Sequence, residues 1–149
     1  MIRSLLIFIC LSFGTSGFAS HILGGDITWT CDGNGDYIFQ LVFYRDCNGA
    51  DVNTVNVDLD VWNHPTITGI QVDFVSREDV SPICTQVSGG PGPFLCGSGA
   101  FGGNGIGAIE KIIYQSAPIT LSGTPPAEGW IFTYEDFSRN TGLTNIQNP

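Results

Sequence analysis

Basic residues are scarce in this chain, and their scarcity excludes two kinds of polyanionic partner. The 149 residues contain five Lys and Arg against fourteen Asp and Glu, which gives a formal charge of −9. A surface of that sign repels nucleic acid and anionic lipid headgroups. We therefore exclude both as partners and expect a soluble exported protein. The acidity also suits a surface that faces carbohydrate or calcium, although a role in solubility explains it equally well.

The motifs of catalysis are also missing. His21 and His64 are the chain's two histidines, and we expect both at the surface, because no G-x-S-x-G or similar nucleophile motif accompanies them. The chain also contains no C-x-x-C pair, which would be the sign of a zinc site. The stretch GSGAFG, residues 97–102, matches G-x-G-x-x-G, but the glycines after it cannot begin the helix that a dinucleotide site needs. We therefore expect a non-enzymatic protein without a cofactor.

Long apolar runs are absent beyond the first twenty residues. Arg3, the apolar segment 5–13 and small residues at Gly17 and Ala19 form the pattern of a secretory signal peptide cut before Ser20. The apolar segment is too short to span a bilayer, and no later segment is long enough to be a membrane helix. We expect a signal peptide over residues 1–19 and one domain over residues 20–149, exported to the cell surface or the medium.

Short alternating segments indicate strands, and no segment keeps a helical period. DGNG, residues 32–35, is a strong hairpin signal between Ile27–Cys31 and Tyr37–Asp46, and both faces of the second strand are apolar, as in a central strand. The other strand candidates are residues 53–62, 68–76, 108–115, 117–121 and 129–137. About seven short strands predict an all-β fold, an immunoglobulin-like or jelly-roll β-sandwich.

Four cysteines follow the leader, and an even number predicts disulfides in an exported chain. Cys84 and Cys96 flank a Gly/Pro-rich loop, and we expect them to form a bridge. The DGNG turn places Cys31 opposite about Tyr37, so Cys47 lies roughly 33 Å further along the strand. A bridge needs Cα atoms within about 7 Å. We therefore expect no bridge between Cys31 and Cys47, while a pairing of Cys47 with Cys84 or Cys96 stays open.

An Asx-rich loop follows the second strand and is a candidate calcium site. Asp46, Asn48 and Asp51 surround a glycine, and oxygen ligands at such spacing suit calcium. The loop lacks the terminal glutamate of an EF-hand. Asx-rich turns also arise for their own hydrogen-bonding reasons, which is the more common explanation.

A candidate glycan contact lies on the strand around residue 60. Asp58, Asp60 and Trp62 share the outward face of residues 53–62, opposite Val55, Val57, Leu59 and Val61. A tryptophan beside carboxylates can form a sugar-binding platform. A glycosidase would need two carboxyl groups across a cleft, which the sequence does not indicate. A solvated strand face is the alternative.

Both ends of the domain resemble one family. SHILGGDI, residues 20–27, and YRDC, residues 44–47, resemble the N-terminal domain of gliding-motility-associated or PKD-domain-containing surface proteins, which the type IX secretion system exports. Near the other end, the chain has segments similar to a tyrosine-rich strand, a W-x-[FI] strand and an I-T-N motif: residues 112–121, 129–140 and 143–149. The resemblance spans nearly the whole of residues 20–149, with the end motifs more specific than the middle.

The resemblance implies a display or adhesion role outside the cell, toward an extracellular protein or glycan surface, and no catalytic residues. It also implies that SHILGG is a first strand, turned into the sheet at Gly24-Gly25. Two features depart from the family. Phe137 and Ser138 stand where the family has two cysteines, so Cys47 would lack a family partner there. The repeated modules and sorting domain of the family are also missing, which suggests a fragment or a short soluble product. The alternative function is a carbohydrate-binding module or a glycan-acting enzyme.

Overall fold

The computed structural model describes residues 21–82, 94–97, 102–104 and 107–136 and consists of β-strands and connecting loops. None of these residues forms a helix long and apolar enough to cross a membrane. The six strands are β1 (His21–Cys31), β2 (Tyr37–Asp46), β3 (Asn56–Trp62), β4 (Gly69–Asp79), β5 (Ile109–Gln115) and β6 (Ile131–Thr133). The prediction of an all-β fold is confirmed, and the described residues contain six strands, where the sequence predicted about seven.

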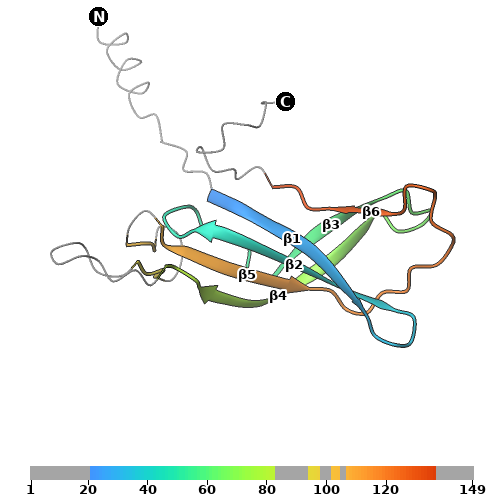
Figure 1. Cartoon of the computed structure of the whole chain (residues 1–149), viewed down its shortest axis with the longest axis horizontal. Coiled ribbons are helices and arrows are strands. Elements are labelled where there is room, and N and C mark those ends of the chain that lie inside the picture. Colours follow the sequence, from blue (N-terminus) through green and yellow to red (C-terminus); the bar gives the residue numbers. More distant parts are fainter. Residues whose placement is uncertain (1–20, 83–93, 98–101, 105–106, 137–149) are drawn as a thin grey trace, which may run out of the picture.

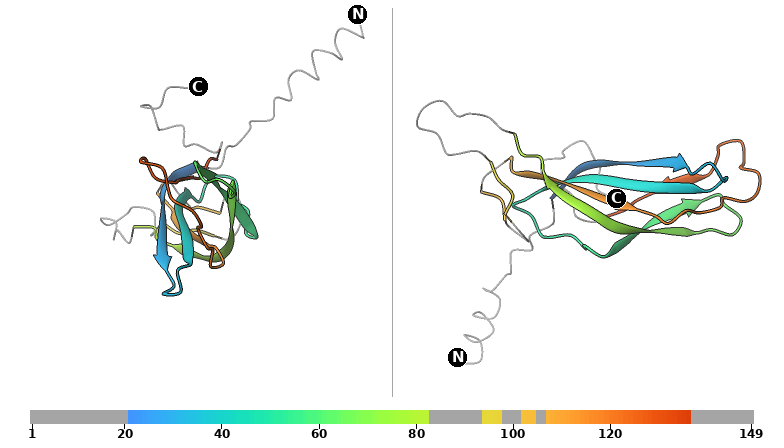
Figure 2. Two further views of the ribbon diagram at one scale, coloured as in Figure 1. Left: turned by 90° about the vertical axis from the view of Figure 1, so that its right-hand side faces the viewer. Right: turned by 90° about the horizontal axis from the view of Figure 1, so that it is seen from below.

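The strands form one antiparallel sheet in the order β1-β2-β5-β4-β3-β6, which curls until it is nearly closed (Figures 1 and 2). β2 lies between β1 and β5, as its two apolar faces predicted. Closure of the sheet is incomplete, since β1 and β6 are its two edges. The curling gives every strand an inner face toward the core and an outer face toward solvent.

The DGNG turn sets the register of the first hairpin. Gly33 and Gly35 both adopt positive φ, of 87° and 98°, which side-chain-bearing residues rarely adopt. The Asp32 carboxylate accepts the Asn34 N–H at 2.7 Å and so stabilises the bend. Cys31 stands opposite Tyr37, as the sequence predicted.

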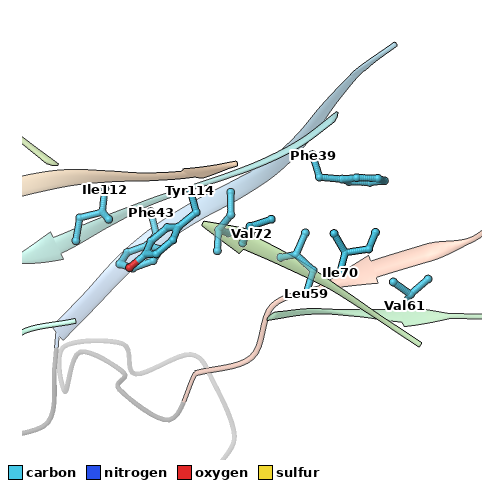
Figure 3. Close-up of a cluster of buried hydrophobic side chains, with 9 residues drawn as sticks. Phe39, Phe43, Leu59, Val61, Ile70, Val72, Ile112 and Tyr114 are labelled. Carbon is cyan, nitrogen blue, oxygen red and sulfur yellow. The ribbon is translucent and has the colours of Figure 1, made fainter. Parts of the chain in front are cut away.

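The core is a single cluster of aliphatic and aromatic side chains from the inner faces of β2, β3, β4 and β5 (Figure 3). Aromatic rings dominate one side of it: Phe39 packs on Phe132 of β6 at 4.6 Å between centroids, and Phe43 lies between Tyr114 and Tyr134. Strict alternation explains the burial, because successive side chains of a strand point to opposite faces. The buried members of the cluster are Phe39, Leu41, Phe43, Leu59, Val61, Ile70, Val72, Ile112 and Tyr114.

The first strand differs from the prediction. Residues 21–31 form one continuous strand, so Gly24-Gly25 do not turn the chain; a bulge at Leu23 shifts the register instead. Gly25 faces Phe43 across the pair, and a Cβ added there would lie 2.8 Å from Phe43 Cβ, closer than two such atoms approach. The second glycine of SHILGG is therefore needed for close packing of β1 on β2.

Three further strand predictions need correction. Residues 117–121 form no named strand; Ile119 makes only an isolated bridge with Tyr37. The last strand is limited to Ile131–Thr133, since residues 134–136 form no ladder. Val55, expected on the inner face, is exposed because it precedes β3 rather than belonging to it. The rest of the β3 alternation is confirmed: Leu59 and Val61 are buried, whereas Asp58, Asp60 and Trp62 are exposed.

Candidate functional site

An exposed aromatic and acidic platform covers the outer face of β3 and β6. It consists of Asp58, Asp60 and Trp62 on β3 with Ile131 and Thr133 on β6. The sheet register places Trp62 opposite Ile131 and Asp60 opposite Thr133. Directly opposed residues of an antiparallel pair share a face. The three residues predicted as a glycan contact therefore stand on one face.

Trp62 is 54% exposed, but its orientation is fixed by a hydrogen bond. Its indole Nε1–H donates to Thr133 Oγ1 at 3.0 Å, so the ring leans across β6. The indole N–H can only donate a hydrogen bond, and here its acceptor is a side chain of the neighbouring strand β6. The ring thus offers a pre-positioned apolar surface beside the Asp60 carboxylate, as stacking on the C–H face of a sugar requires.

The carboxylates of the platform lie along one strand. Asp58 and Asp60 are separated by one residue, so their Cα atoms are about 7 Å apart on the outer face. Asp58 pairs with Gln71 of β4, and the Gln71 amide is turned to Asp73 at 2.8 Å. Such an arrangement offers acceptors for hydroxyl groups. It does not place two carboxyl groups on opposite sides of a substrate, as glycoside hydrolysis needs.

The candidate calcium loop is engaged in other interactions. Asp46 Oδ1 accepts both the backbone N–H and the side-chain amide of Asn48, each at 2.9 Å, which is an Asx turn. Asp51 is turned to Arg77, with 2.6 Å between Nη2 and Oδ1. Within the described parts of the chain, no three His, Cys, Asp or Glu side chains gather as a metal site would require.

A buried ion-pair network occupies the end of the core below this loop, and sequence reasoning missed it. Arg45 on β2 is fully buried and stands directly opposite the buried Glu110 of β5, to which its Nε–H donates. The Arg45 Nη1 also donates to the carbonyl oxygens of Gly49 and Ala50. Buried charges persist only when they are paired and hydrogen-bonded. The guanidinium therefore holds the Asx-rich loop onto the sheet.

A bulge in β4 brings a second arginine into this network. The inner-face residues Ile70, Val72 and Phe74 are even-numbered, so a regular strand would turn Arg77 outward. The register with β5 slips between Phe74 and Ser76, and Arg77 then lies opposite Ile112 on the inner face. Its Nε lies 3.1 Å from Glu110 Oε2. The alternating pattern of β4 carries no sign of this slip.

The ion-pair network lowers the pKa of Asp51, which lies at its edge. Partial burial by itself raises the pKa of Asp51, but hydrogen bonds from Arg77 and the Val52 N–H, with the charges of both arginines, hold the pKa below its usual value. Burial raises the pKa of the Tyr114 phenol to about 12. That hydroxyl donates to the carbonyl oxygen of Asn53, so it also ties the loop before β3 to the core.

The disulfide pairing requires a correction. Cys47 is bonded to Cys96, with 5.5 Å between the Cα atoms, so the predicted Cys84–Cys96 bridge is wrong. Cys84 itself lies outside the described residues. The reason is tertiary: the Cys96 N–H donates to Asp79 at the end of β4, and Gly103 donates to the Cys47 carbonyl. These contacts bring the segment around Cys96 to the end of β2.

The remaining expectation for the cysteines is confirmed. Cys31 and Cys47 are not joined, and Cys31 is an exposed free thiol. The hairpin register explains this result, since Cys31 lies at the turn end of β1 and Cys47 follows the opposite end of β2. Pairing of Cys47 with Cys96 is one of the two alternatives that the sequence left open.

His64 is buried rather than exposed, contrary to the sequence expectation. Its Nδ1 accepts the backbone N–H groups of Thr66 and Ile67, and its ring packs on Trp130 at 4.8 Å between centroids. It therefore organises the turn between β3 and β4. His21 is the first residue of β1.

A comparison of the chain with protein family models, with curated proteins and with solved structures found no match.

Proposed function

We propose that this chain is a non-enzymatic, exported surface module with a display or adhesion role, similar to the N-terminal domain of gliding-motility-associated proteins. One observation carries the proposal: the last three residues of the YRDC segment each have a structural partner. Arg45 is paired with the buried Glu110, Asp46 accepts the N–H of its own turn, and Cys47 is bonded to Cys96. YRDC, one of the two motifs on which the resemblance mainly rests, therefore stabilises the fold and does not form a reactive centre.

The cysteine chemistry supports export. Disulfides form and persist in oxidising compartments, and they are rare where glutathione keeps thiols reduced. Cys47 is fully buried, so the Cys47 side of the Cys47–Cys96 bond is shielded from external thiols, whereas Cys96 is half-buried. A framework disulfide next to a buried ion pair suits a small domain that must survive outside the cell.

Export can be tested with the full chain and its own leader. Expressed in a bacterial host, the chain is expected in the periplasmic or surface fraction with a new N-terminus at Ser20. Leu6→Arg, which interrupts the apolar segment of the leader, should retain the chain in the cytosol. Recovery of the unaltered chain in the cytosol, with Cys47 and Cys96 reduced, would overturn the proposal.

A second candidate function is glycan binding on the β3–β6 platform. The observation that favours it is the hydrogen bond between Trp62 Nε1 and Thr133 Oγ1, which fixes an exposed indole beside Asp60. Fixing an aromatic ring before binding lowers the entropic cost of holding a ligand. The acidic neighbours then supply acceptors for sugar hydroxyl groups.

Affinity electrophoresis across a panel of polysaccharides tests this candidate. Retention by one polysaccharide should fall at least about tenfold in Trp62→Ala. Retention should fall less in Thr133→Val, which removes the hydrogen bond to the Trp62 indole but leaves the indole in place. Tyr44→Ala, which removes an exposed aromatic side chain from β2, is the control and should leave retention unchanged. Equal mobility of all variants in every gel would rule out the platform as a glycan site.

A further inference from the structure

Among the described strands, none pairs with the longer of the two sheet edges, β1. β1 spans eleven residues and pairs with β2 on one side, and no other described strand pairs with it (Figure 1). Edge strands expose a row of backbone N–H and C=O groups, and proteins usually protect them with charges, prolines or short length. β1 carries one acidic residue, Asp26, and neither lysine, arginine nor proline. Its protective features are therefore this one carboxylate and the bulge at Leu23.

A core-facing tryptophan on this edge is uncovered. Trp29 stands opposite Phe39, so both side chains share the inner face of the sheet. Phe39 is 1% exposed, whereas Trp29 is 59% exposed. The difference arises because β2 has a neighbour on each side and β1 has only one. The free edge of β1 and the exposure of Trp29 therefore have the same cause: no described strand lies beside β1 on that side.

We propose that β1 is a homodimer interface, at which the β1 strand of a second copy adds in the antiparallel direction with its two-fold axis at Ile27. Opposed residues of an antiparallel pair must share a face, so the axis must pass through a residue and not between two. An axis at Asp26 would oppose two carboxylates. An axis at Thr28 would bring Gly24 opposite Asp32, a residue of the hairpin turn. An axis at Ile27 avoids both conflicts.

The register at Ile27 is also self-complementary. It pairs Gly24 to Thr30 with the same seven residues of the second copy, which is the regular part of β1 after the bulge. Trp29 then lies opposite Gly25, whose missing side chain leaves space for the indole, a pairing known to stabilise glycine in strands. On the outer face, Asp26 lies opposite Thr28, which offers a hydroxyl donor. The two sheets would continue as one across the dimer.

Net charge sets the condition under which the dimer forms. Each copy carries a formal charge of −9, so the two copies repel one another over a Debye length of about 10 Å at 0.1 M salt. The interface itself contains one carboxylate per copy, opposite a neutral threonine. Salt therefore weakens the repulsion without weakening the contact, and dimerisation should increase with ionic strength.

Sedimentation measurements test the dimer with the full chain, purified from the compartment in which it accumulates and carrying Cys31→Ser to prevent random thiol bridges. We expect a reversible monomer–dimer equilibrium. Trp29→Lys should raise the dimer dissociation constant at least about tenfold. Trp62→Lys, which places the same charge at an equally exposed tryptophan on β3, should leave it unchanged. A single monomeric species at all concentrations and salt levels would overturn the proposal.

Engineered cysteines test the register in the same background. Asp26→Cys and Thr28→Cys, each alone, should form few cross-linked dimers, because neither residue faces its own copy. A mixture of the two variants should cross-link under mild oxidation, because residue 26 faces residue 28 across the axis. Efficient cross-linking of either variant with itself would overturn the register. If iodide failed to quench Trp29 in a monomer, another segment of the same chain would cover Trp29. That result would overturn the homodimer.

Discussion

Two adjacent glycines in β1 illustrate how differently neighbouring residues contribute. Gly25 lies on the inner face against the backbone of Val42 and Phe43, whereas a Cβ on Gly24 would meet nothing within 4 Å. Gly25→Ala should therefore push β1 away from β2 and lower the free energy of unfolding by about 1–3 kcal/mol. Gly24→Ala is the control and should change it by less than about 1 kcal/mol. Urea unfolding measures both, and equal effects would contradict the packing argument.

The buried pair of Arg45 and Glu110 makes a second prediction at the residue scale. Glu110→Gln removes the buried carboxylate that pairs with the Arg45 guanidinium and leaves Asp51 Oδ1 at 3.9 Å, so the free energy of unfolding should fall by about 3–5 kcal/mol. Glu78→Gln makes the same chemical change at an exposed position of β4 and should have little effect. The double variant Arg45→Met with Glu110→Leu should recover most of the loss, since it removes both charges. Urea unfolding of the three variants provides the test; no recovery would mean that the charges themselves are required.

At the scale of elements, one disulfide joins the end of β2 to the segment after β4. Non-reducing peptide mapping should yield a peptide that links Cys47 to Cys96. The bond closes a loop with a sequence separation of 49, for which the chain-entropy estimate is about 4 kcal/mol. Cys47→Ser with Cys96→Ser should lower the free energy of unfolding by up to that amount. Cys31→Ser should leave it unchanged, because the Cys31 thiol is exposed and unpaired; equal losses would show that the bridge does not constrain the fold.

For the whole molecule, the loss of stability at low pH follows from carboxyl groups whose pKa is lowered in the folded chain. The pKa of Asp51 in the folded chain is below the ordinary value of 3.8. Its contribution to stability is therefore complete above pH 3.8, and it is lost as the pH falls through the folded pKa. Asp51→Asn should flatten the loss of stability below about pH 4, as followed by urea unfolding at a series of pH values. An unchanged slope in Asp51→Asn would contradict this assignment.

A second carboxylate contributes to the same limb. The Ser81 hydroxyl and the N–H groups of Cys96 and Ser81 lower the pKa of Asp79, although its slight burial acts in the opposite direction. Because Asp79 anchors the segment that carries Cys96, its protonation below about pH 4 should loosen that segment first. Hydrogen exchange at the Cys96 amide should then accelerate before global unfolding, and simultaneous exchange of all amides would contradict this order.

The sequence by itself determined the features that depend on near neighbours. Alternation assigned the inner and outer faces of β3, because the side-chain period of a strand is fixed. For β2 the two apolar faces predicted only a central position in the sheet, which the strand order confirms. The DGNG turn set the register of the first hairpin, and that register kept Cys31 away from Cys47. Asp58, Asp60 and Trp62 consequently stand on one outer face, as the sequence predicted.

The tertiary structure decided the features that depend on distant segments. It chose Cys96 as the partner of Cys47, because the end of β4 carries that segment to the end of β2. The bulge in β4 turned Arg77 inward, since only the pairing with β5 reveals the slipped register. Trp29 remains exposed because β1 is an edge, and strand order is set by long-range pairing rather than by local pattern.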